Sequence, residues 1–501
     1  MIPSVRQQTV YNTWTNTDSN ILIQAVAGGA KTTTLMGILA LCEYRTLFLA
    51  FNKSIQEEIG SRIEADPRLA HAKSMTLHSL GLSAIKYKYG RFTLNKSKNY
   101  LIIKQLQTYN RSLFAGMAWE DKAKTTLTLM EMNDVSRIYL TEDITEITTH
   151  MTSMDKFFYI HPDMDELWKE FLFIREQFTA DLMIDYIDMI YVPVSQDLFI
   201  PIQPYYLMID EAQDLNLAQH KLIDNLLGQG DIRKWVAVGD RRQSIYGFSG
   251  SHAGSFDLFK AKDNVYELPL DVCYRCPQEI INEANLIYDV IEPFKTYPGV
   301  VGTIIDYRLI KDSSMVICRN SGPLLDLYFQ LLSINKKVFI KGEDILNGVI
   351  RFLRPYQYKT ISQTMQKISF EILEISEIEN KSEELRFKLY KLKDNLKNFI
   401  LLSKHYCKPT DKVDVIIAEL EHMFKTIDDS EAITLCTIHK SKGLEADVVY
   451  ILNEFLIPSK FAKSLVQLEQ EQNLKYVART RAKEEMYYLN ITGEKDELEE
   501  I

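Results

Sequence analysis

The stretch Ile23-Gln24-Ala25-Val26-Ala27-Gly28-Gly29-Ala30-Lys31-Thr32-Thr33-Thr34-Leu35 decides the fold of this 501-residue chain. An apolar run from Ile21 to Ile23 leads into it, and apolar residues at helical spacing, Leu35, Ile38 and Leu39, follow it. This pattern predicts a strand, a loop that cradles phosphates and a helix whose N-terminus faces them. It nearly matches the P-loop of nucleotide-binding proteins.

The chemistry of a P-loop assigns roles to individual residues. Backbone N–H groups hold the phosphates, the lysine reaches the outer phosphates, and the next hydroxyl binds Mg²⁺. Lys31 and Thr32 fill the last two roles. The pattern asks for glycine before the lysine, where Ala30 stands; if this residue is left-handed, its methyl group costs about 1–2 kcal/mol and weakens nucleotide binding. The residues expected to contact the nucleotide here are Ala27, Gly28, Gly29, Ala30, Lys31, Thr32 and Thr33.

The composition is that of a multidomain globular protein, with 46% hydrophobic and 25% charged residues. No apolar run approaches the roughly 18 residues of a membrane span, and no basic-then-apolar leader is present, so we expect a cytosolic site of action without a membrane partner. The six cysteines are scattered, which suits a reducing compartment. Only Cys273 and Cys276 have metal-like spacing, and without a second close pair they are expected to be buried thiols.

The net charge of −10 excludes a protein that is basic all over but leaves room for a local basic groove. One segment has such an excess of cations interleaved with aromatic residues. It is either a solvated helical face or a nucleic-acid surface, and its cations are Lys86, Lys88, Arg91, Lys96, Lys98 and Lys104.

Strand and helix patterns alternate along most of the chain, as in parallel sheets wrapped by helices. Two strands, 205–209 and 235–239, deliver acidic residues at their carboxyl ends, where such sheets place ligands. Asp210-Glu211 follows five apolar residues and reads as a Walker B pair, in which one carboxylate holds Mg²⁺ and the next orients or deprotonates the attacking water. A linker is expected near 267–271. The later strands are expected near 301–305, 315–318, 337–340, 433–437 and 448–452.

Taken together and in order, these motifs resemble superfamily 1 helicases of the UvrD/Rep type, with similarity to the F-box DNA helicase branch and its phage relatives. The resemblance implies that Gln7, with Gln8 as the alternative, recognises the adenine base of ATP. It also implies that Tyr274 stacks on this base. It implies that Gln243, Arg275 and Arg481 act at the γ-phosphate and that Glu445 lies close to the nucleotide. The catalytic set that follows is Lys31, Asp210, Glu211, Gln243, Arg275 and Arg481.

The resemblance also implies a path for DNA. Tyr246 and Phe248 lie two residues apart, so on an extended segment their rings share a face and could stack on bases for roughly 1–3 kcal/mol each, the alternative being core packing. Ser249 stands where the family has an arginine that couples DNA to hydrolysis, and Asp185 to Met189 is similar to an acidic helix start. The implied DNA-binding residues are Phe51, Asn52, Lys53, Thr76, His78, Tyr246, Phe248, Thr437 and His439.

The fold expected from the resemblance is α/β, with two RecA-like P-loop domains that have parallel sheets, each carrying a mainly helical insertion. The expected boundaries are 1–81 with 176–268 for the first domain, 82–175 for its insertion, 269–344 with 429–493 for the second domain, 345–428 for its short insertion and 494–501 for an acidic tail.

The function implied is that of an ATP- and Mg²⁺-dependent DNA helicase or single-stranded DNA translocase, moving 3′ to 5′ on single-stranded and tailed duplex DNA in a bacterial or phage-infected cell. Protein partners are not specified by the sequence. Two alternatives remain open: a DNA-binding module that hardly turns over ATP because of Ala30, and a translocase that strips proteins from DNA or serves a nuclease partner.

Overall fold

The computed structural model describes residues 3–109, 114–117, 119–154, 156, 159, 161–247, 250–251, 254–341, 350, 352–356, 358–378, 389, 392–393, 395–396, 399–400, 402–403, 407–423, 431–460 and 462–491. The chain divides into two compact units. The first comprises Met1–Tyr274, Val290–Glu292 and Lys463–Asn473, and the second comprises Arg275–Asp289, Pro293–Ala462 and Leu474–Ile501.

The first unit is built on a six-stranded parallel sheet of order β3-β2-β6-β7-β1-β8. The strand before the P-loop, β1, lies between β7 and β8, so both of its neighbours deliver their carboxyl ends to the same edge of the sheet. The strands are β1 (Asn20–Ala25), β2 (Thr46–Ala50), β3 (Ala72–Thr76), β6 (Tyr206–Ile209), β7 (Lys234–Gly239) and β8 (Val265–Leu270).

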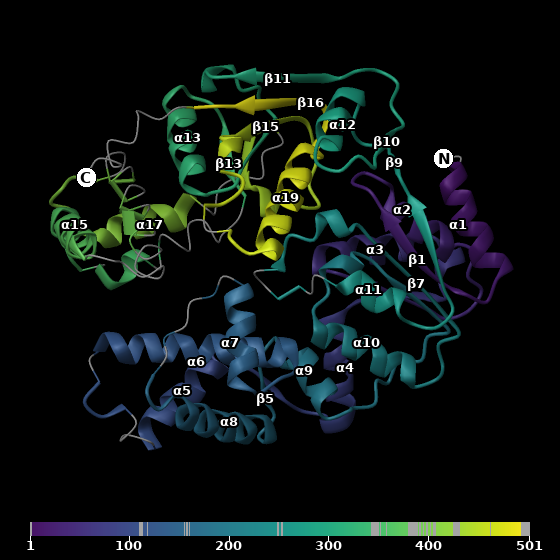
Figure 1. Ribbon diagram of the computed structural model, residues 1–501, viewed down its shortest axis with the longest axis horizontal. Coiled ribbons are helices and arrows are strands. Elements are labelled where there is room, and N and C mark those ends of the chain that lie inside the picture. Colours follow the sequence, from purple (N-terminus) through teal and green to yellow (C-terminus); the bar gives the residue numbers. More distant parts are fainter. Residues whose placement is uncertain are drawn as a thin grey trace. The chain divides into compact units, whose positions relative to one another are not determined.

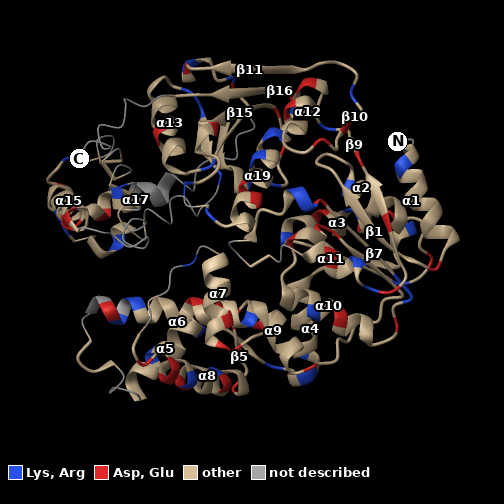
Figure 2. Ribbon diagram, in the orientation of Figure 1, with Lys and Arg blue, Asp and Glu red and all other residues tan. Residues whose placement is uncertain are grey.

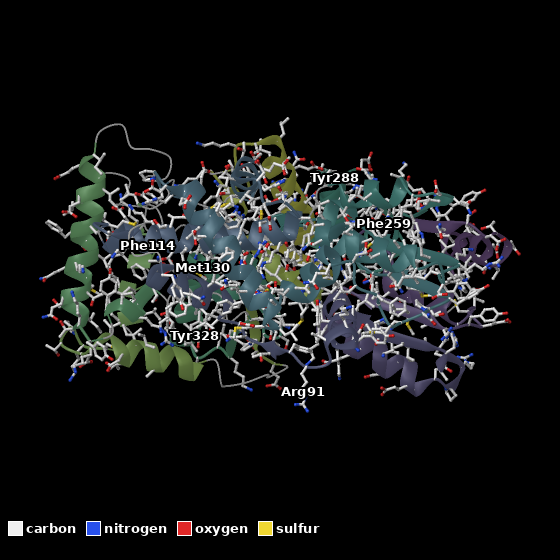
Figure 3. The ribbon with its side chains drawn as sticks, turned by 90° about the horizontal axis from the view of Figure 1, so that it is seen from below. Arg91, Phe114, Met130, Phe259, Tyr288 and Tyr328 are labelled. Atoms are coloured by element: carbon white, nitrogen blue, oxygen red, sulfur yellow. The ribbon has the colours of Figure 1, made fainter. Side chains whose placement is uncertain are left out.

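Helices cover both faces of this sheet (Figure 1), which is why its strands are apolar on both sides. Ile21 and Ile23 pack on one face with α1 (Val5–Asn16), α2 (Lys31–Leu39) and α3 (Lys53–Ala65). Leu22 and other strand residues pack on the opposite face, around Phe259, which Figure 3 labels. The helices of that face are α4 (Leu77–Tyr89), α9 (Asp188–Ser195), α10 (Leu217–Gly228) and α11 (Ser255–Lys260).

Most of the described residues between 98 and 180 are helical, and they have a core of their own in which Phe114 and Leu167 are buried and Met130 packs at the side. Figure 1 shows α5, α6 and α8 running alongside one another, and Figure 2 shows acidic and basic residues mixed along α8. The helices are α5 (Lys98–Tyr109), α6 (Trp119–Tyr139), α7 (Ile144–Ser153) and α8 (Met164–Ala180), and the short strands β4 (Thr93–Leu94) and β5 (Met183–Ile184) pair beside them.

A buried ionic cluster ties this helical region to α9. Lys98 Nζ lies 2.7 Å from Asp188 Oδ2, and Arg137 Nη1 lies 2.7 Å from Asp185 and 2.9 Å from Asp188. Although burial alone would raise it, Arg137 and Lys98 hold the pKa of Asp188 below its ordinary value. The interpretation of Lys98 as part of an exposed basic face is therefore wrong, because its side chain is buried and its ammonium group pairs with Asp188.

The other cations of that segment are exposed. Arg91 points away from the ribbon in Figure 3, and Lys96 lies 5.4 Å from the centroid of the Tyr186 ring.

The second unit has its own six-stranded parallel sheet, of order β11-β16-β15-β12-β14-β13. Its strands are β11 (Val300–Ile304), β12 (Met315–Cys318), β13 (Val338–Ile340), β14 (Ile433–Thr437), β15 (Ala446–Leu452) and β16 (Ala482–Leu489). The expected strands are confirmed, whereas β16 is a strand that the sequence reasoning did not predict. Its helices are α12 (Gln278–Asn285), α13 (Gly322–Ser333), α15 (Ile361–Glu377), α17 (Val413–Met423), α18 (Ile438–Ser441) and the last part of α19 (Leu465–Arg479). The strands β9 (Val272–Cys273) and β10 (Glu292–Pro293) form a separate two-stranded pair, in which Val272, Cys273 and Glu292 belong to the first unit.

The linker expected at 267–271 is wrong, because Val265–Leu270 forms the strand β8, which pairs with β1. Since β8 lies at the edge of the sheet, it tolerates Pro269, which has no N–H to donate. Much of the expected helical insertion 345–428 and the acidic tail 494–501 lie outside the described residues.

Within the residues that the structure describes, no helix is long and apolar enough to cross a membrane.

Candidate active site

The P-loop closes the carboxyl end of β1 with a conformation fixed by the fold. Gly28 has a positive φ of 67°, and a Cβ on Gly29 would lie 2.9 Å from Val26 O and 3.0 Å from Leu270 O. Ala30 is left-handed, with φ 59° and ψ 38°, and α2 begins directly after it. Ala30 therefore has the left-handed conformation for which the sequence analysis predicts a cost of about 1–2 kcal/mol.

Hydrogen bonds hold this loop on several sides. Val26 N–H donates to Leu270 O at 2.9 Å and Tyr274 N–H donates to Gly28 O at 3.0 Å. Thr34 donates twice to Ala30 O, from its N–H and from its hydroxyl, each at 2.9 Å. The left-handed residue is thus built into the sheet edge and the first turn of α2.

Lys31 and the Walker B carboxylates form one cluster. Lys31 Nζ lies 2.9 Å from Glu211 Oε1, and Thr32 Oγ1 donates to Asp210 Oδ2 at 3.1 Å. Burial, with the neighbouring Glu211 charge, raises the pKa of Asp210 to about 6. Burial lowers the pKa of Lys31, but the carboxylates of Glu211, Asp240 and Asp210 outweigh it, so the net shift is upward and the lysine stays charged.

The donor set of this cluster fits Mg²⁺. The ion prefers oxygen ligands and keeps several waters, so a Thr32 hydroxyl and an Asp210 carboxylate with substrate phosphates are a sufficient set. Asp210 is buried beside a second carboxylate, and a cation there would supply countercharge. Across the described ranges, no group of three or more His, Cys, Asp or Glu side chains is gathered to hold a metal by itself, which such a site does not need.

A second layer of polar groups lies behind Glu211. Glu211 is left-handed with φ 51°, and its N–H donates to Asp210 Oδ1 at 2.8 Å. Gln213 donates from Nε2 to Glu211 Oε2 and accepts from Asp240 N–H at 2.9 Å. Gln243 Nε2 in turn donates to Asp240 Oδ2 at 2.8 Å. The ends of β6 and β7 are therefore joined by a continuous hydrogen-bonded path.

The two expected adenine-contacting residues lie around the P-loop. Gln7 is buried, accepts from Ser4 N–H in a capping box of α1, and donates from Nε2 to Thr34 Oγ1 at 3.1 Å. Tyr274 is joined to the loop through its backbone N–H. The fold brings both residues next to the P-loop, although they lie far apart in the sequence.

Some of the expected DNA-binding residues also come together. Phe51, after β2, stacks on Tyr246 with ring centroids 6.0 Å apart and planes 15° from parallel. Asn52 accepts the N–H of Ile55 and so caps α3, while Lys53 is exposed. Phe248 and Ser249 lie outside the described residues.

Thr76 and Thr437 occupy corresponding places in the two units. Each caps the helix that follows a parallel strand, by accepting an N–H three residues on, and each is followed two residues later by a histidine. Burial lowers the pKa of His78. Burial, with the nearby Arg319 and Lys440 charges, lowers the pKa of His439 to about 3. Both histidines are neutral at pH 7, so they offer hydrogen bonds rather than charge.

The second unit gathers the other expected nucleotide residues around Thr480. Arg275 donates from Nε to Glu445 Oε2 at 2.7 Å and from Nη1 to Thr480 O at 3.0 Å. Arg481, which is buried, donates from Nη2 to Thr480 Oγ1 at 3.2 Å and from Nε to Val477 O at 2.9 Å. Burial would raise the pKa of Glu445, but Arg275 and Lys483 hold it below its ordinary value.

Gln213 was not predicted to be a member of the site. The acidic residue after strand 235–239, Asp240, was expected at the ligand edge of the sheet, as Asp210 was after strand 205–209, but it was given no role in the site. Nothing in the local sequence says that the amide of Gln213 turns back to Glu211.

The fold and this site define a P-loop nucleotide-binding protein with two parallel-sheet α/β units. Residues 6–264 match the model of the UvrD/REP helicase N-terminal domain, and residues 354–492 match that of the UvrD-like helicase C-terminal domain. The chain belongs to the UvrD/REP helicase family.

Curated relatives carry names that agree with this family. The ATP-dependent DNA helicase Rep of Buchnera aphidicola (from Schizaphis graminum) is 26% identical over 299 residues, covering 55% of this chain and 43% of the relative. The putative ATP-dependent DNA helicase YjcD of Bacillus subtilis is 35% identical over 393 residues, covering 56% and 51%. The RecBCD enzyme subunit RecB of Chlamydia pneumoniae is 24% identical over 375 residues, covering 56% and 35%. The matches span about half of these relatives' length or less.

Proposed function

We propose that this protein is an ATP- and Mg²⁺-dependent DNA helicase that moves 3′ to 5′ along single-stranded DNA and opens tailed duplexes. The observation that carries the proposal is the cluster of Lys31, Thr32, Asp210 and Glu211 at the carboxyl edge of the first sheet. It lies in the same unit as the stacked rings of Phe51 and Tyr246, which present an aromatic surface of the kind that single-stranded DNA uses.

Each residue has a role in this proposal. Lys31 binds the outer phosphates, and Thr32 and Asp210 hold Mg²⁺, which supplies charge neutralisation at the β- and γ-phosphates when bound. Glu211 orients the attacking water and accepts its proton. Gln243, Arg275 and Arg481 stabilise the charge that develops on the γ-phosphate, and Glu445 lies close to the nucleotide.

The remaining site residues bind the base and the DNA. Gln7 and Tyr274 contact adenine. Bases stack on Tyr246, and the other expected contacts with DNA come from Phe51, Asn52, Lys53, Thr76, His78, Phe248, Thr437 and His439. The domain boundaries given from the sequence remain part of this proposal.

The test is ATP turnover by the purified chain with and without single-stranded DNA. We expect DNA to stimulate turnover and Lys31→Ala or Glu211→Gln to abolish the stimulated rate. Lys260→Ala, a change of an exposed lysine paired with Glu267, is the matched control and should keep the full rate. Stimulated turnover that survives Lys31→Ala would show that the ATP site is assigned wrongly.

Strand separation is a second measurement on the same preparations. Duplexes with a 3′ tail should be opened and those with a 5′ tail should not. Opening of only the 5′-tailed duplex would refute the proposed direction. Stimulated ATP turnover without any strand displacement would favour a translocase that strips proteins from DNA or serves a nuclease partner.

A second candidate function is favoured by one observation, the left-handed φ of 59° at Ala30. If this strain weakens nucleotide binding, the chain is a DNA-binding module with little ATP turnover. Replacing Ala30 by glycine separates the two functions.

A further inference from the structure

One segment of the first unit differs in charge from the rest of the chain. Between Asp66 and Glu120 the sequence has nine Lys and Arg residues and no Asp or Glu. At the average acidic content of the chain, 68 of 501 residues, these 53 residues would include about seven. A protein of net charge −10 thus has no carboxylate side chain in this segment. We call the exposed side chains from Lys86 to Lys104 the basic strip.

The cations of the basic strip have no carboxylate partners in the part of the chain that the structure describes. Four of them are exposed, and none of these forms an ion pair with a described carboxylate: Lys86, Lys88, Arg91 and Lys96. Their charges are therefore available to phosphates, which release counterions when lysine and arginine neutralise them. Other exposed cations of the first unit do have carboxylate partners, at 2.6 to 2.8 Å: Arg62 with Glu58, Arg68 with Asp66, Arg233 with Asp18 and Lys260 with Glu267.

Exposed aromatic rings lie among these cations. Tyr87, between Lys86 and Lys88, is 65% exposed, and its ring centroid lies 5.6 Å from that of the exposed Phe199. Tyr100 is 58% exposed and lies one helical turn before Lys104 on α5. Cations for phosphates and open rings for base faces are the two features of a surface that binds single-stranded nucleic acid. A duplex keeps its base faces stacked inside, so the rings favour a single strand.

The basic strip lies away from the DNA-binding residues of the proposed function. The helix α4 begins directly after Thr76 and ends at Tyr89. At 1.5 Å per residue its two ends are about 18 Å apart. Thr76 and His78 lie at the first end, and Tyr87 lies at the other. A strand bound at one end of α4 therefore leaves the other end free.

We propose that the basic strip is a second binding site for single-stranded DNA. Its cations bind phosphates, and Tyr87 and Tyr100 stack on bases. Because none of its residues lies in the P-loop or the Walker B cluster, the site binds DNA in the absence of nucleotide. The inference goes beyond the proposed function, which uses no residue of the basic strip.

The strip variant replaces all four unpaired cations by glutamine, and its binding to oligothymidine is measured by fluorescence anisotropy without nucleotide. Single-stranded DNA gives a slope of about −0.7 per neutralised phosphate in a plot of log K against log salt. We therefore expect the slope to become shallower by about 3, and the affinity at low salt to fall about 10-fold. The control variant replaces Arg62, Arg68, Arg233 and Lys260 by glutamine. It loses the same charge from cations that already have partners, so its slope should stay within about one of the parent slope.

Photo-cross-linking shows where the strand lies. Oligothymidine that carries 5-iodouracil should cross-link to Tyr87 or Tyr100, which peptide mass spectrometry identifies. Tyr87→Ala should weaken binding about fivefold or more, the usual loss for one stacked base. Tyr266→Ala, which removes a tyrosine that is 52% exposed on β8, is the matched control and should bind like the parent.

Each outcome decides the inference. A strip variant with the parent slope overturns it, and so do cross-links at Tyr246 without any in the basic strip, which leave the proposed function intact. Poly-glutamate binding that is lost in the strip variant while oligothymidine binding is kept overturns it in favour of an acidic protein partner. Blunt duplex that binds as tightly as oligothymidine and loses as much affinity in the strip variant overturns the preference for a single strand. Cross-links in the strip of a parent that lacks DNA-stimulated ATP turnover support the inference and refute the proposed function alone.

Discussion

Replacing Ala30 by glycine tests how the departure from the P-loop pattern affects this protein. Ala30 has φ 59° and ψ 38°, a conformation that costs a non-glycine residue about 1–2 kcal/mol. Glycine removes that cost but loses roughly 0.5–1 kcal/mol through the greater freedom of its unfolded chain. The net expectation is a gain of about 0.5–1 kcal/mol in the free energy of unfolding.

The hydrogen bonds around Ala30 indicate that this gain appears in the stability of the protein and not in its affinity for nucleotide. Thr34 holds Ala30 O with two hydrogen bonds of 2.9 Å, and Thr34 in turn accepts from Gln7 at 3.1 Å. Because these bonds make the left-handed residue part of the fold, the strain is common to the free and nucleotide-bound protein and cancels from binding. We therefore expect a Tm higher by about 1–4 °C, with nucleotide affinity and kcat within about twofold of the parent.

Thermal unfolding followed by calorimetry and ATP turnover with single-stranded DNA are the two assays. Ala40→Gly is the matched control, because Ala40 ends the same helix with a right-handed φ of −70°, and it should not raise the Tm. A gain of fivefold or more in turnover with an unchanged Tm would refute this reasoning. It would show that the strain acts on nucleotide binding and would favour the DNA-binding module.

Three further predictions concern other parts of the molecule. Lys98→Met should lower the free energy of unfolding by about 3 kcal/mol in urea titrations, because it leaves Asp188 without one buried partner; a loss under about 1 kcal/mol would contradict the cluster's role. Arg275→Ala should lower DNA-stimulated kcat about 10³-fold, as the loss of a γ-phosphate arginine does, with DNA affinity unchanged; a parent-like kcat would exclude that role. Burial raises the pKa of Cys318 and Cys436 to about 12, so neither thiol forms the reactive thiolate at pH 8. Iodoacetamide should therefore label them no faster than the protein unfolds, which peptide mass spectrometry can check.

Much of the fold could be predicted because its signals are local. The P-loop strand and helix, the apolar strands and the capping side chains at Asn52, Thr76 and Thr437 are each recorded within a few consecutive residues. Strands buried on both faces give continuous apolar runs, which the sequence displays directly.

Within the two six-stranded sheets, β8 and β16 could not be predicted, for reasons that are not local. β8 has weak apolar character and contains Pro269, and only its pairing with β1 at the sheet edge makes it a strand. β16 begins with the polar run Lys483 to Glu485, whose charges are met by partners far along the chain, among them Lys295, which lies 3.1 Å from Glu484. Neither the position of β8 at the sheet edge nor the distant partners of β16 can be recognised from a short stretch of sequence.

The sequence by itself indicated the family and most of the residues of the candidate site, because each motif carries its own residue types in a fixed order. Only the tertiary structure decided how these residues are used. It made Ala30 left-handed, took Lys98 out of the solvent to balance Asp188, and turned the Gln213 amide toward Glu211 and Asp240. The physical reason is that burial, countercharge and hydrogen-bond direction depend on neighbours that lie far apart in the sequence.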